Sequence, residues 1–398
     1  MQNGQFRVMQ TVSDLDIGGA QEVVRTLAEH LAEIGCIPVV CAFKDGPLRK
    51  EIERKGIPVE VLPERRYSIL AFPLFVWEML WLRRALLEVV KKYQINVIQT
   101  HLLRSLDFLA LTLRCRTKLL VFWTVQNANF TLREDHLPRH KWLLGPKRLA
   151  HRLLYRLAAR WVNGFIAVSD EVRTAILEGI GPVEDKITVI CNSVDLRRYQ
   201  QPVDRAAIRR QLGLPANARV MAVVATFKKQ KGHCYLVEAA RSVVPQFPDL
   251  HILLIGDGEL REALEAQTKA SGLDGHIHFL GTRHDVPDLL GSSDYFVLPS
   301  LWEGLPMALV EAMATGLPVI ATEVSGTKQV MVSGETGLLV PPGNVPRLQE
   351  AMVELLSEPA RARAMGTAAR HRVEAFFSAQ KQVADHMTLY RREWDRSE

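Results

Sequence analysis

The chain has 398 residues and a formal net charge of +6, with 47% hydrophobic and 24% charged residues. These proportions are those of a globular protein with ample core material, and the length favours two domains over one. The mild basic excess suits an anionic ligand or an anionic lipid surface. No nucleic-acid-binding pattern accompanies the charge, so we expect no nucleic acid as a partner.

The five cysteines are scattered and show no zinc-like spacing. This argues against a disulfide framework or a structural zinc and predicts a reducing, cytoplasmic compartment. The first residues lead almost directly into a strand-like segment and carry no secretory signal pattern. The most apolar stretch, residues 68–82, is too short to span a bilayer.

Short apolar, β-branched runs alternate with longer segments of helical period in the first half of the chain. We expect strands over 7–12, 37–43, 58–62, 97–100, 118–125 and 164–168. Helices are expected between them, over 20–34, 72–93, 105–114 and 147–162. This βαβα alternation predicts a parallel sheet with helices on both faces.

The alternation pauses over the polar, arginine-rich residues 195–217 and then restarts. Strands are expected over 219–225, 251–255, 277–280, 295–298, 319–321 and 337–340, and one or two helices over 359–394. We therefore predict two doubly wound α/β domains, residues 1–200 and 201–375, followed by a C-terminal helix over 376–398.

A strand that ends at Leu298 is followed by a turn and by a helix that we expect to begin at Pro306 and to close at Gly316. Proline suits the first helical position because its missing N–H had no partner there. The free N–H groups of Met307 and its neighbours would form an anion site, aided by the helix dipole. This loop lies where open α/β sheets bind ligands, outside the carboxyl end of a strand.

Two carboxylates flank this helix start. Glu303 lies in the loop, and Glu311 lies roughly 7 Å further along the helix. The pair suits a ligand with a central diphosphate, because each carboxylate accepts hydrogen bonds from the hydroxyls of a sugar or a ribose. The alternative interpretation is an ordinary solvated helix face.

Three more motifs stand around this pair: Lys231-Gly232-His233, Gly256-Asp257-Gly258 and Phe279-Leu280-Gly281. Together with Glu303-x7-Glu311, in this order and spacing, they closely resemble the retaining, GT-B-fold glycosyltransferases of family 4. The first half matches more loosely, through Gly18-Gly19-Ala20-Gln21 and residues 166–169. The resemblance covers nearly the whole chain.

The resemblance implies two Rossmann-like domains facing a central cleft, with C-terminal helices that cross back to the first domain. It implies a hexosyltransferase that moves a hexosyl unit from a UDP- or GDP-sugar to a glycan, lipid-linked or small-molecule acceptor with retention. The second domain would hold the donor and the first the acceptor. Neither a metal nor a cofactor is expected.

The resemblance also implies roles for single residues. Lys231 would neutralise the donor diphosphate, Glu303 would bind the donor sugar, and Glu311 would hold the ribose. Thr282 and Arg283 would lie by the base. The full donor-binding set is Gly18, Gly19, Thr226, Lys228, Lys231, Gly256, Thr282, Arg283, Glu303, Gly304, Leu305, Pro306, Met307 and Glu311.

The sequence departs from the family pattern at two places. Gln126 stands where a histidine usually faces the donor sugar, and glutamine can donate a hydrogen bond but cannot take a proton near neutral pH. Thr226 replaces an arginine, whose charge Lys228 or Lys229 would supply. Glu303, Lys231, Gln126 and His101 are the catalytic candidates, although His101 also suits a buried structural role.

These departures keep two other functions open: a nucleotide-sugar epimerase on the same fold, and a catalytically weak partner subunit. A dinucleotide-dependent dehydrogenase is disfavoured because no G-x-G-x-x-G follows either domain's first strand. The Asp14-x-Asp16 pattern resembles a metal motif, but we interpret it as a chance pair.

A basic segment spans residues 133–160, and Arg148, Arg152, Arg156 and Arg160 share one helical stripe beside a stripe of leucines, Leu149, Leu153 and Leu157. Upstream lie the aromatic residues Phe72, Phe75, Trp77 and Trp81. One interpretation is peripheral contact with the inner face of the membrane. The other is an amphipathic helix whose leucines pack on the core.

Overall fold

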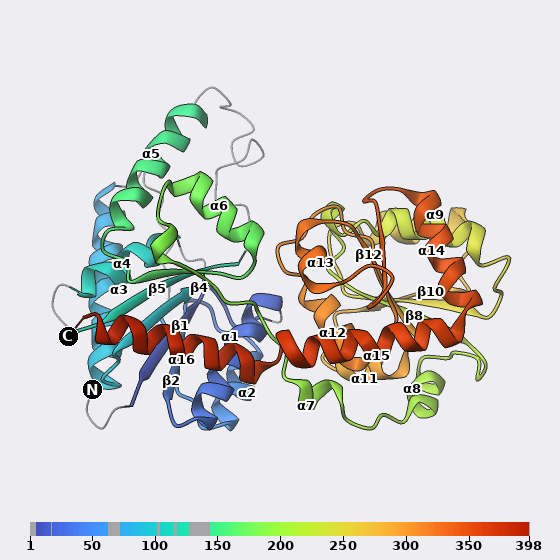
Figure 1. Ribbon diagram of the computed structural model, residues 1–398, viewed down its shortest axis with the longest axis horizontal. Coiled ribbons are helices and arrows are strands. Elements are labelled where there is room, and N and C mark those ends of the chain that lie inside the picture. Colours follow the sequence, from blue (N-terminus) through green and yellow to red (C-terminus); the bar gives the residue numbers. More distant parts are fainter. Residues whose placement is uncertain are drawn as a thin grey trace. The chain divides into compact units, whose positions relative to one another are not determined.

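The computed structural model describes residues 5–16, 18–62, 72–101, 104–114, 118–126 and 144–397. The chain divides into an N-terminal unit, Met1–Asn192 with Ala379–Glu398, and a C-terminal unit, Ser193–Ser378. The chain therefore passes between units after residues 192 and 378, where the sequence suggested 200 and 375. Each unit is built around one parallel sheet with helices packed on it (Figure 1).

The described strands of the N-terminal unit form a seven-stranded sheet in the order β3-β2-β1-β4-β5-β6-β7, with all neighbours parallel. Their bounds are β1 Arg7–Val12, β2 Ile37–Ala42, β3 Val59–Val61, β4 Val97–His101, β5 Leu120–Val125, β6 Gly164–Ala167 and β7 Ile187–Val189. The strands are apolar and largely buried because helices cover both faces of a parallel sheet.

The helices of this unit are α1 Gly19–Glu33, α2 Leu48–Arg54, α3 Phe72–Lys92, α4 Arg104–Arg114, α5 Leu144–Ala158, α6 Asp170–Ile180 and α16 Ala379–Asp395. A 3-10 turn covers Glu184–Lys186. The last helix, α16, packs on α1 and β5 (Figure 1). Its Tyr390 is fully buried, with its ring 5.9 Å from that of Phe6 and 5.3 Å from that of Phe122. The C-terminal residues therefore complete the N-terminal core.

The described strands of the C-terminal unit form a six-stranded parallel sheet in the order β10-β9-β8-β11-β12-β13. Their bounds are β8 Arg219–Val224, β9 Leu250–Ile255, β10 Ile277–Gly281, β11 Tyr295–Leu298, β12 Val319–Thr322 and β13 Leu338–Val340. The helices are α7 Leu196–Tyr199, α8 Arg205–Gln211, α9 His233–Val243, α10 Arg261–Ala270, α11 Val286–Ser292, α12 Met307–Thr315, α13 Ser325–Val330, α14 Val345–Ser357 and α15 Pro359–Phe376.

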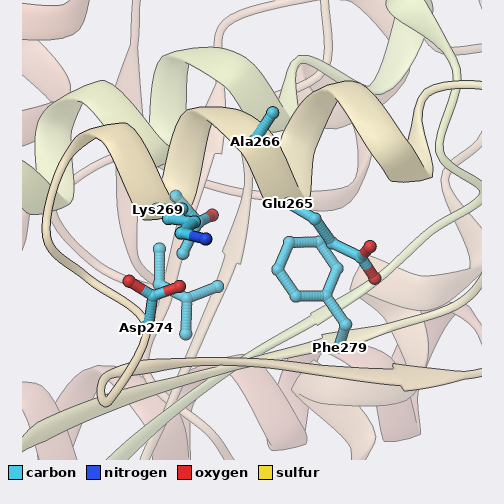
Figure 2. A pocket seen from close by; sticks show the side chains of 7 residues that line it. Glu265, Ala266, Lys269, Asp274 and Phe279 are labelled. Atoms are coloured by element: carbon cyan, nitrogen blue, oxygen red, sulfur yellow. The ribbon is translucent and has the colours of Figure 1, made fainter.

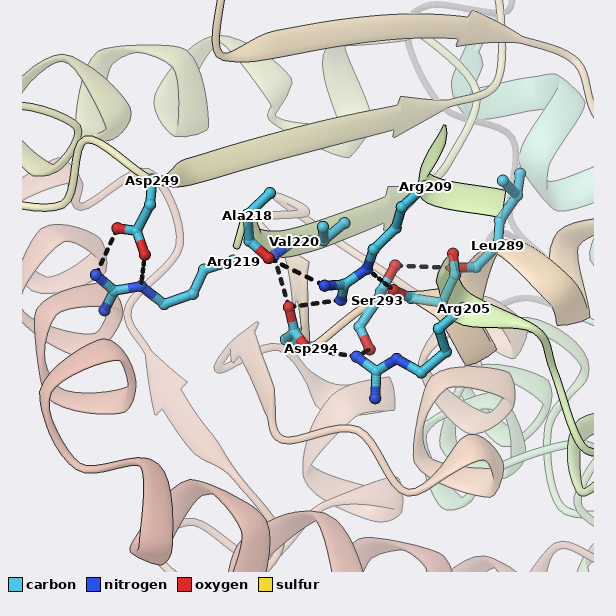
Figure 3. A network of polar contacts seen from close by, with 10 residues as sticks. Arg205, Arg209, Ala218, Arg219, Val220, Asp249, Leu289, Ser293 and Asp294 are labelled. Atoms are coloured by element: carbon cyan, nitrogen blue, oxygen red, sulfur yellow. Dashed lines mark hydrogen bonds and ion pairs between the residues drawn. The ribbon is translucent and has the colours of Figure 1, made fainter. Parts of the chain in front are cut away.

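The polar stretch before β8 holds α7 and α8, and the arginines of α8 bind the amino ends of the strands (Figure 3). Arg209 Nη2 lies 2.8 Å from Asp294 Oδ2, and Arg205 also pairs with Asp294. The backbone N–H of Val220 donates to the same Asp294 Oδ2 at 2.8 Å. Asp294 therefore joins α8 to the amino ends of β8 and β11.

Candidate functional site

Lys231 and Glu303 meet beyond the carboxyl ends of two adjacent strands in the C-terminal unit. Strand order reverses between β8 and β11, which makes this pair the topological switch point of the sheet. Lys231 follows β8, Glu303 follows β11, and Lys231 Nζ lies 2.6 Å from Glu303 Oε1. The Glu303 side chain is only 6% exposed and that of Lys231 is 22% exposed. The two motifs are thus brought together where α/β sheets bind ligands.

Hydrogen bonds fix the two loops that carry this pair. The Ser300 hydroxyl donates to Glu303 Oε1 at 2.6 Å, so this oxygen has two donors. The Leu301 N–H donates to the Gln230 carbonyl at 2.7 Å, and Gln230 Nε2 donates to the Trp302 carbonyl at 2.8 Å. The loops after β8 and β11 therefore hold one another in position.

Two glycines allow the backbones to pack this closely. Gly232 has φ +66°, and a Cβ on it would lie 2.0 Å from the Pro299 carbonyl oxygen. A Cβ on Gly326, at the start of α13, would lie 2.1 Å from the Gly304 carbonyl oxygen. Any side chain at either position would push apart the backbone around Glu303.

Helix α12 begins at Met307, and Pro306 is its N-cap instead of the first helical residue that the sequence suggested. No side chain caps this end, and the first turn carries no acidic residue. The first N–H groups of a helix have no intrahelical acceptor, and the dipole there favours an anion. The start of α12 is therefore suited to a negatively charged ligand, with Gly304 and Leu305 leading into it. Glu311 lies half-buried further along this helix.

The remaining donor candidates of the C-terminal unit follow neighbouring strands. Thr226 and Lys228 are exposed after β8, and Thr282 is exposed after β10. Gly256 follows β9 with φ +143°, and a Cβ on it would lie 2.1 Å from the Ala225 carbonyl oxygen. All of these residues therefore lie at the carboxyl edge of the sheet that carries Lys231 and Glu303.

Arg283 is also at this edge, but its guanidinium is already paired. Its Nε and Nη2 lie 2.8 Å and 2.6 Å from the two carboxylate oxygens of Asp285. This bidentate contact raises the pKa of Arg283 and lowers the pKa of Asp285. A base-binding role for Arg283 would have to operate beside, or by breaking, this pair.

His233, the first residue of α9, is a buried group next to Lys231 that the candidate set omitted. Its ring lies edge-on to Phe227 at 5.0 Å, and neither ring nitrogen has a partner among the described residues. Burial, followed by the charge of Lys231, lowers the pKa of His233 to about 4. The ring is therefore neutral near pH 7. Its place in the Lys-Gly-His motif was the only sequence signal for it.

In the N-terminal unit, Gln126 and His101 lie at the carboxyl ends of the adjacent strands β5 and β4. Gln126 Nε2 is 3.2 Å from His101 Nδ1, and Gln126 Oε1 accepts from Asn192 Nδ2 at 2.7 Å. Burial, followed by the charge of His386, lowers the pKa of His101 to about 3. His101 is therefore buried, as the structural interpretation expected, and also contacts the other catalytic candidate of this unit.

Gly18 is the N-cap of α1 and Gly19 its first residue, with no side chain capping the helix. Gly18 has φ −168°, an extended conformation open to any residue. Asp14 Oδ1 accepts from Gln21 at 2.7 Å, and Asp16 pairs with Lys44 at 2.5 Å. Both carboxylates of the Asp-x-Asp pattern thus have partners within the chain.

The leucine stripe of α5 does not pack on the core. Leu149, Leu153 and Leu157 are 59%, 51% and 49% exposed, so the core-packing interpretation was wrong. Arg152 and Arg156 are exposed on the same helix, with Arg160 just beyond it. Residues 133–143 of the basic segment lie outside the described residues, as do the side chains of Phe72, Phe75 and Arg148. Among the helices that the structure describes, none combines the length and hydropathy needed to span a bilayer.

A separate pocket of about 420 Å³ lies between α10 and the edge strand β10 (Figure 2). Glu265 and Lys269 of α10 and Phe279 of β10 are among its lining residues. Figure 2 shows their side chains around the hollow. None of the candidate catalytic or donor-binding residues lines this pocket.

The chain matches known protein families and a solved structure over both of its units. Residues 17–198 match the family described as "Glycosyltransferase Family 4", and residues 204–372 match "Glycosyl transferases group 1". The solved structure of Anabaena Alr3699/HepE in complex with UDP and glucose superimposes with a TM-score of 0.79. It is 21% identical in sequence, and the match covers 96% of this chain and 99% of that one. The fold is GT-B, as expected.

Two curated relatives are each 30% identical to the chain over the aligned residues. The UDP-Gal:alpha-D-GlcNAc-diphosphoundecaprenol alpha-1,3-galactosyltransferase of Escherichia coli is 30% identical over 61% of this chain and 65% of its own. The N-acetyl-alpha-D-glucosaminyl L-malate synthase of Bacillus anthracis is 30% identical over 56% of this chain and 58% of its own. The matches span less than two thirds of the length of either relative.

The two family matches together run from residue 17 to residue 372 and leave only residues 199–203 between them. Their boundary falls close to the point where the chain passes from one structural unit to the other. The chain therefore belongs to the family 4 glycosyltransferases.

Proposed function

We propose that the chain transfers a hexosyl unit from a UDP- or GDP-sugar to an acceptor, with retention of the anomeric configuration. The observation that carries this proposal is the Lys231–Glu303 pair, 2.6 Å apart at the switch point of the C-terminal sheet and next to the uncapped start of α12. A cation and a helix N-terminus side by side suit a diphosphate, and a shielded carboxylate beside them suits a polyol.

The diphosphate leaving group defines the chemistry of this site. As the glycosidic bond breaks, negative charge grows on the diphosphate oxygens, and Lys231 with the N–H groups at the start of α12 would stabilise it. These fixed positive groups take the place of a divalent cation, so we propose a metal-independent reaction. Glu303 would accept hydrogen bonds from donor-sugar hydroxyls, and Glu311 from the ribose. Thr282 would lie by the base.

One relative and one surface of the chain support a proposal for the class of acceptor. The E. coli relative is named for an undecaprenol-linked acceptor and a UDP-galactose donor. We propose a glycan or lipid-linked acceptor here, with a small molecule as the other option, bound through the N-terminal unit. The exposed leucines and arginines of α5 support the lipid-linked form, because such an acceptor is held at a membrane surface.

The first experiment is calorimetric binding of UDP, GDP and ADP, and of their common sugar conjugates, to the wild type and to Glu311→Ala. We expect one nucleotide to bind, and Glu311→Ala to weaken it through loss of the ribose contact. EDTA should leave the affinity unchanged. A folded wild type that binds none of these ligands would contradict the proposal and favour a catalytically weak partner subunit.

Product analysis separates transfer from epimerisation. The selected nucleotide-sugar is incubated without acceptor, and the sugar is examined for a change at a ring carbon. We expect intact donor and slow release of free sugar by transfer to water. Accumulation of an isomerised nucleotide-sugar would identify an epimerase instead.

We also propose that α5 contacts an anionic lipid surface at the inner face of the membrane. Its exposed leucines would enter the headgroup layer while Arg152, Arg156 and Arg160 pair with lipid phosphates. We expect sedimentation with vesicles of 70% phosphatidylcholine and 30% phosphatidylglycerol, and at least tenfold weaker binding for the double variant Leu153→Glu and Leu157→Glu. Ile34→Glu, another exposed apolar residue, is the control and should bind normally. Equal binding of all three proteins would sink this proposal.

A further inference from the structure

A row of buried polar side chains crosses the N-terminal unit from α16 to the carboxyl end of β5. It begins at the Gln382 carbonyl, which lies 2.8 Å from His386 Nδ1. A carbonyl only accepts, so His386 Nδ1 carries the proton and its Nε2 is an acceptor. Gln99 Nε2 donates to that Nε2 at 3.1 Å, which turns Gln99 Oε1 toward the next residue. The Tyr390 hydroxyl donates to the same oxygen.

The row continues through side chains on β1 and β4. Gln10 Nε2 donates to Gln99 Oε1 at 3.4 Å, which leaves Gln10 Oε1 facing His101 Nε2 at 2.6 Å. An amide oxygen only accepts, so His101 carries its proton on Nε2 and presents Nδ1 as an acceptor. Gln126 Nε2 donates to this Nδ1, and Asn192 Nδ2 donates to Gln126 Oε1. Every bond in the row thus points the same way.

This uniform direction determines how the Gln126 amide is oriented. A glutamine amide has two N–H donors, and Gln126 gives one of them to His101. The second N–H has no partner among the described residues, and Gln126 is half-buried at the carboxyl edge of the sheet. A flipped amide would place its oxygen against the acceptor Nδ1 of His101 and its NH2 group against the Nδ2–H donor of Asn192, so the flip would lose both hydrogen bonds.

We propose that His101 is a positioning residue, held as its Nε2–H tautomer by the row from α16, which fixes Gln126 so that its second N–H is a permanent donor to a substrate oxygen. Gln126 would be the group that touches the substrate, and His101, Gln10 and Gln99 act only through it. This proposal rests on the proposed glycosyl transfer. It gives the N-terminal unit a hydrogen-bond donor whose protonation does not depend on pH, whereas a histidine at position 126 would gain or lose a proton near neutral pH.

Burial supports the neutral state that this row requires. It lowers the pKa of His101 to about 3 and the pKa of His386 to about 4. Protonation of either ring would put two donors against each other at one contact in the row. The row therefore keeps one direction throughout the neutral pH range.

The kinetic test compares two substitutions of similar shape at one position. Asn in His101→Asn keeps an acceptor oxygen near the place of Nδ1, whereas His101→Leu removes it. We expect His101→Leu to lower kcat about tenfold for hydrolysis of UDP-glucose, UDP-galactose or GDP-mannose, whichever the wild type accepts. His101→Asn should retain most of kcat, and UDP or GDP affinity should be unchanged in both.

A double-mutant cycle then separates positioning from general packing. If His101 acts only through Gln126, His101→Leu should lower kcat no further in a Gln126→Leu background. Additive losses, or equal losses for His101→Asn and His101→Leu, would overturn the proposal. Normal kcat in Gln126→Leu would overturn it as well.

An activity-free measurement keeps this proposal distinguishable from the proposed function. Nitrogen NMR of histidine-labelled full-length protein at pH 7 reports the tautomer of each ring, and His101→Asn identifies the His101 signals. We expect a protonated Nε2 and an unprotonated Nδ1 that shifts in Gln126→Leu. A protonated Nδ1 would refute the row even in an active enzyme, and failure of nucleotide binding would leave this result to stand by itself.

Discussion

Lys231 and Glu303 are 72 residues apart in the chain and share one hydrogen bond. Glu303 Oε1 receives both Lys231 and Ser300, so Lys231 is held in place before any ligand arrives. A cation fixed in advance stabilises developing charge without further reorganisation, which is where fixed electrostatic groups contribute most.

Lys231→Ala tests this role directly. We expect kcat to fall by about 10²- to 10³-fold, in line with the loss of one oriented donor to a developing charge. The matched control is Lys269→Ala, a lysine on α10 beside the separate pocket, which should keep full activity. Steady-state kinetics with thermal melting of both variants is the measurement. Loss of activity only in step with loss of folded protein would argue against the role.

The buried histidines make stability depend on pH. An unfolded histidine titrates near pH 6.5, whereas burial holds the pKa of His233 at about 4 in the folded chain. Between these values the unfolded chain binds a proton that the folded chain does not, so stability falls as pH falls. Each such histidine contributes about 1.4 kcal/mol per pH unit well inside this window.

Urea unfolding at several pH values from 7 down to 5 measures this slope. We expect His233→Phe, which keeps the ring contact with Phe227, to have a shallower slope than the wild type. Identical slopes for the two proteins would show that His233 is not a buried neutral group.

At the scale of elements, the sequence predicted most strands to within a residue or two, because buried parallel strands are continuous apolar runs with turns on either side. It missed β7, Ile187–Val189, which is three half-buried residues at the sheet edge after a charged turn. It also omitted α2 and α6, although Ser169 caps α6 by accepting from the Val172 N–H.

The site was predictable only where motifs carried it. Lys231, Glu303 and Glu311 were predicted because they stand in motifs whose order and spacing resemble the family 4 pattern. The contacts of His101 were not predictable, because Gln10 is 91 positions before it in the chain and His386 reaches the same row from the last helix. The exposure of the α5 leucines could not be predicted from the sequence either, because an amphipathic pattern does not show whether the apolar face of a helix is covered by the rest of the protein.

Helix α8 offers a prediction about how the C-terminal unit is stabilised. Arg209 is 13% exposed and donates to the carbonyls of Ser292 and Ala218 as well as to Asp294. Arg205 is 49% exposed, pairs with Asp294 and donates to the Ser293 carbonyl (Figure 3). We expect Arg209→Ala to lower the free energy of unfolding by about 2 to 4 kcal/mol and Arg205→Ala by less than about 1 kcal/mol. Urea denaturation of both variants measures these two changes. Equal losses of unfolding free energy for the two variants would contradict the larger contribution that we assign to Arg209.

At the scale of the whole molecule, the N-terminal unit is discontinuous in sequence. Its sheet is formed by residues before Asn192, but α16 begins at Ala379, after the entire C-terminal unit. Phe6 and Phe122 pack on Tyr390 of α16, so the core of the first unit contains side chains from both ends of the chain.

Tyr390→Ala should therefore destabilise one unit selectively. Truncation of a buried aromatic residue typically costs about 3 to 5 kcal/mol, here with the added loss of the hydroxyl bond to Gln99. We expect faster hydrogen exchange across β1, β4 and β5 by mass spectrometry, with the strands of the C-terminal unit unchanged. Leu355→Ala on α14 is the reciprocal control, and it should accelerate exchange in the C-terminal unit. A uniform effect of either variant would mean that the units unfold together.

The position of α16 also has a consequence for how the chain is made. During synthesis the strands of the N-terminal sheet leave the ribosome long before α16, which packs on this unit. The apolar surface that α16 covers therefore stays exposed while residues 193–378 are translated. The C-terminal unit is contiguous and has all of its own core by then. The core of the C-terminal unit is thus complete before that of the N-terminal unit, the reverse of the order of synthesis. A nascent chain stalled before Ala379 would expose to chaperones an N-terminal unit that lacks α16, together with a C-terminal unit whose core is complete.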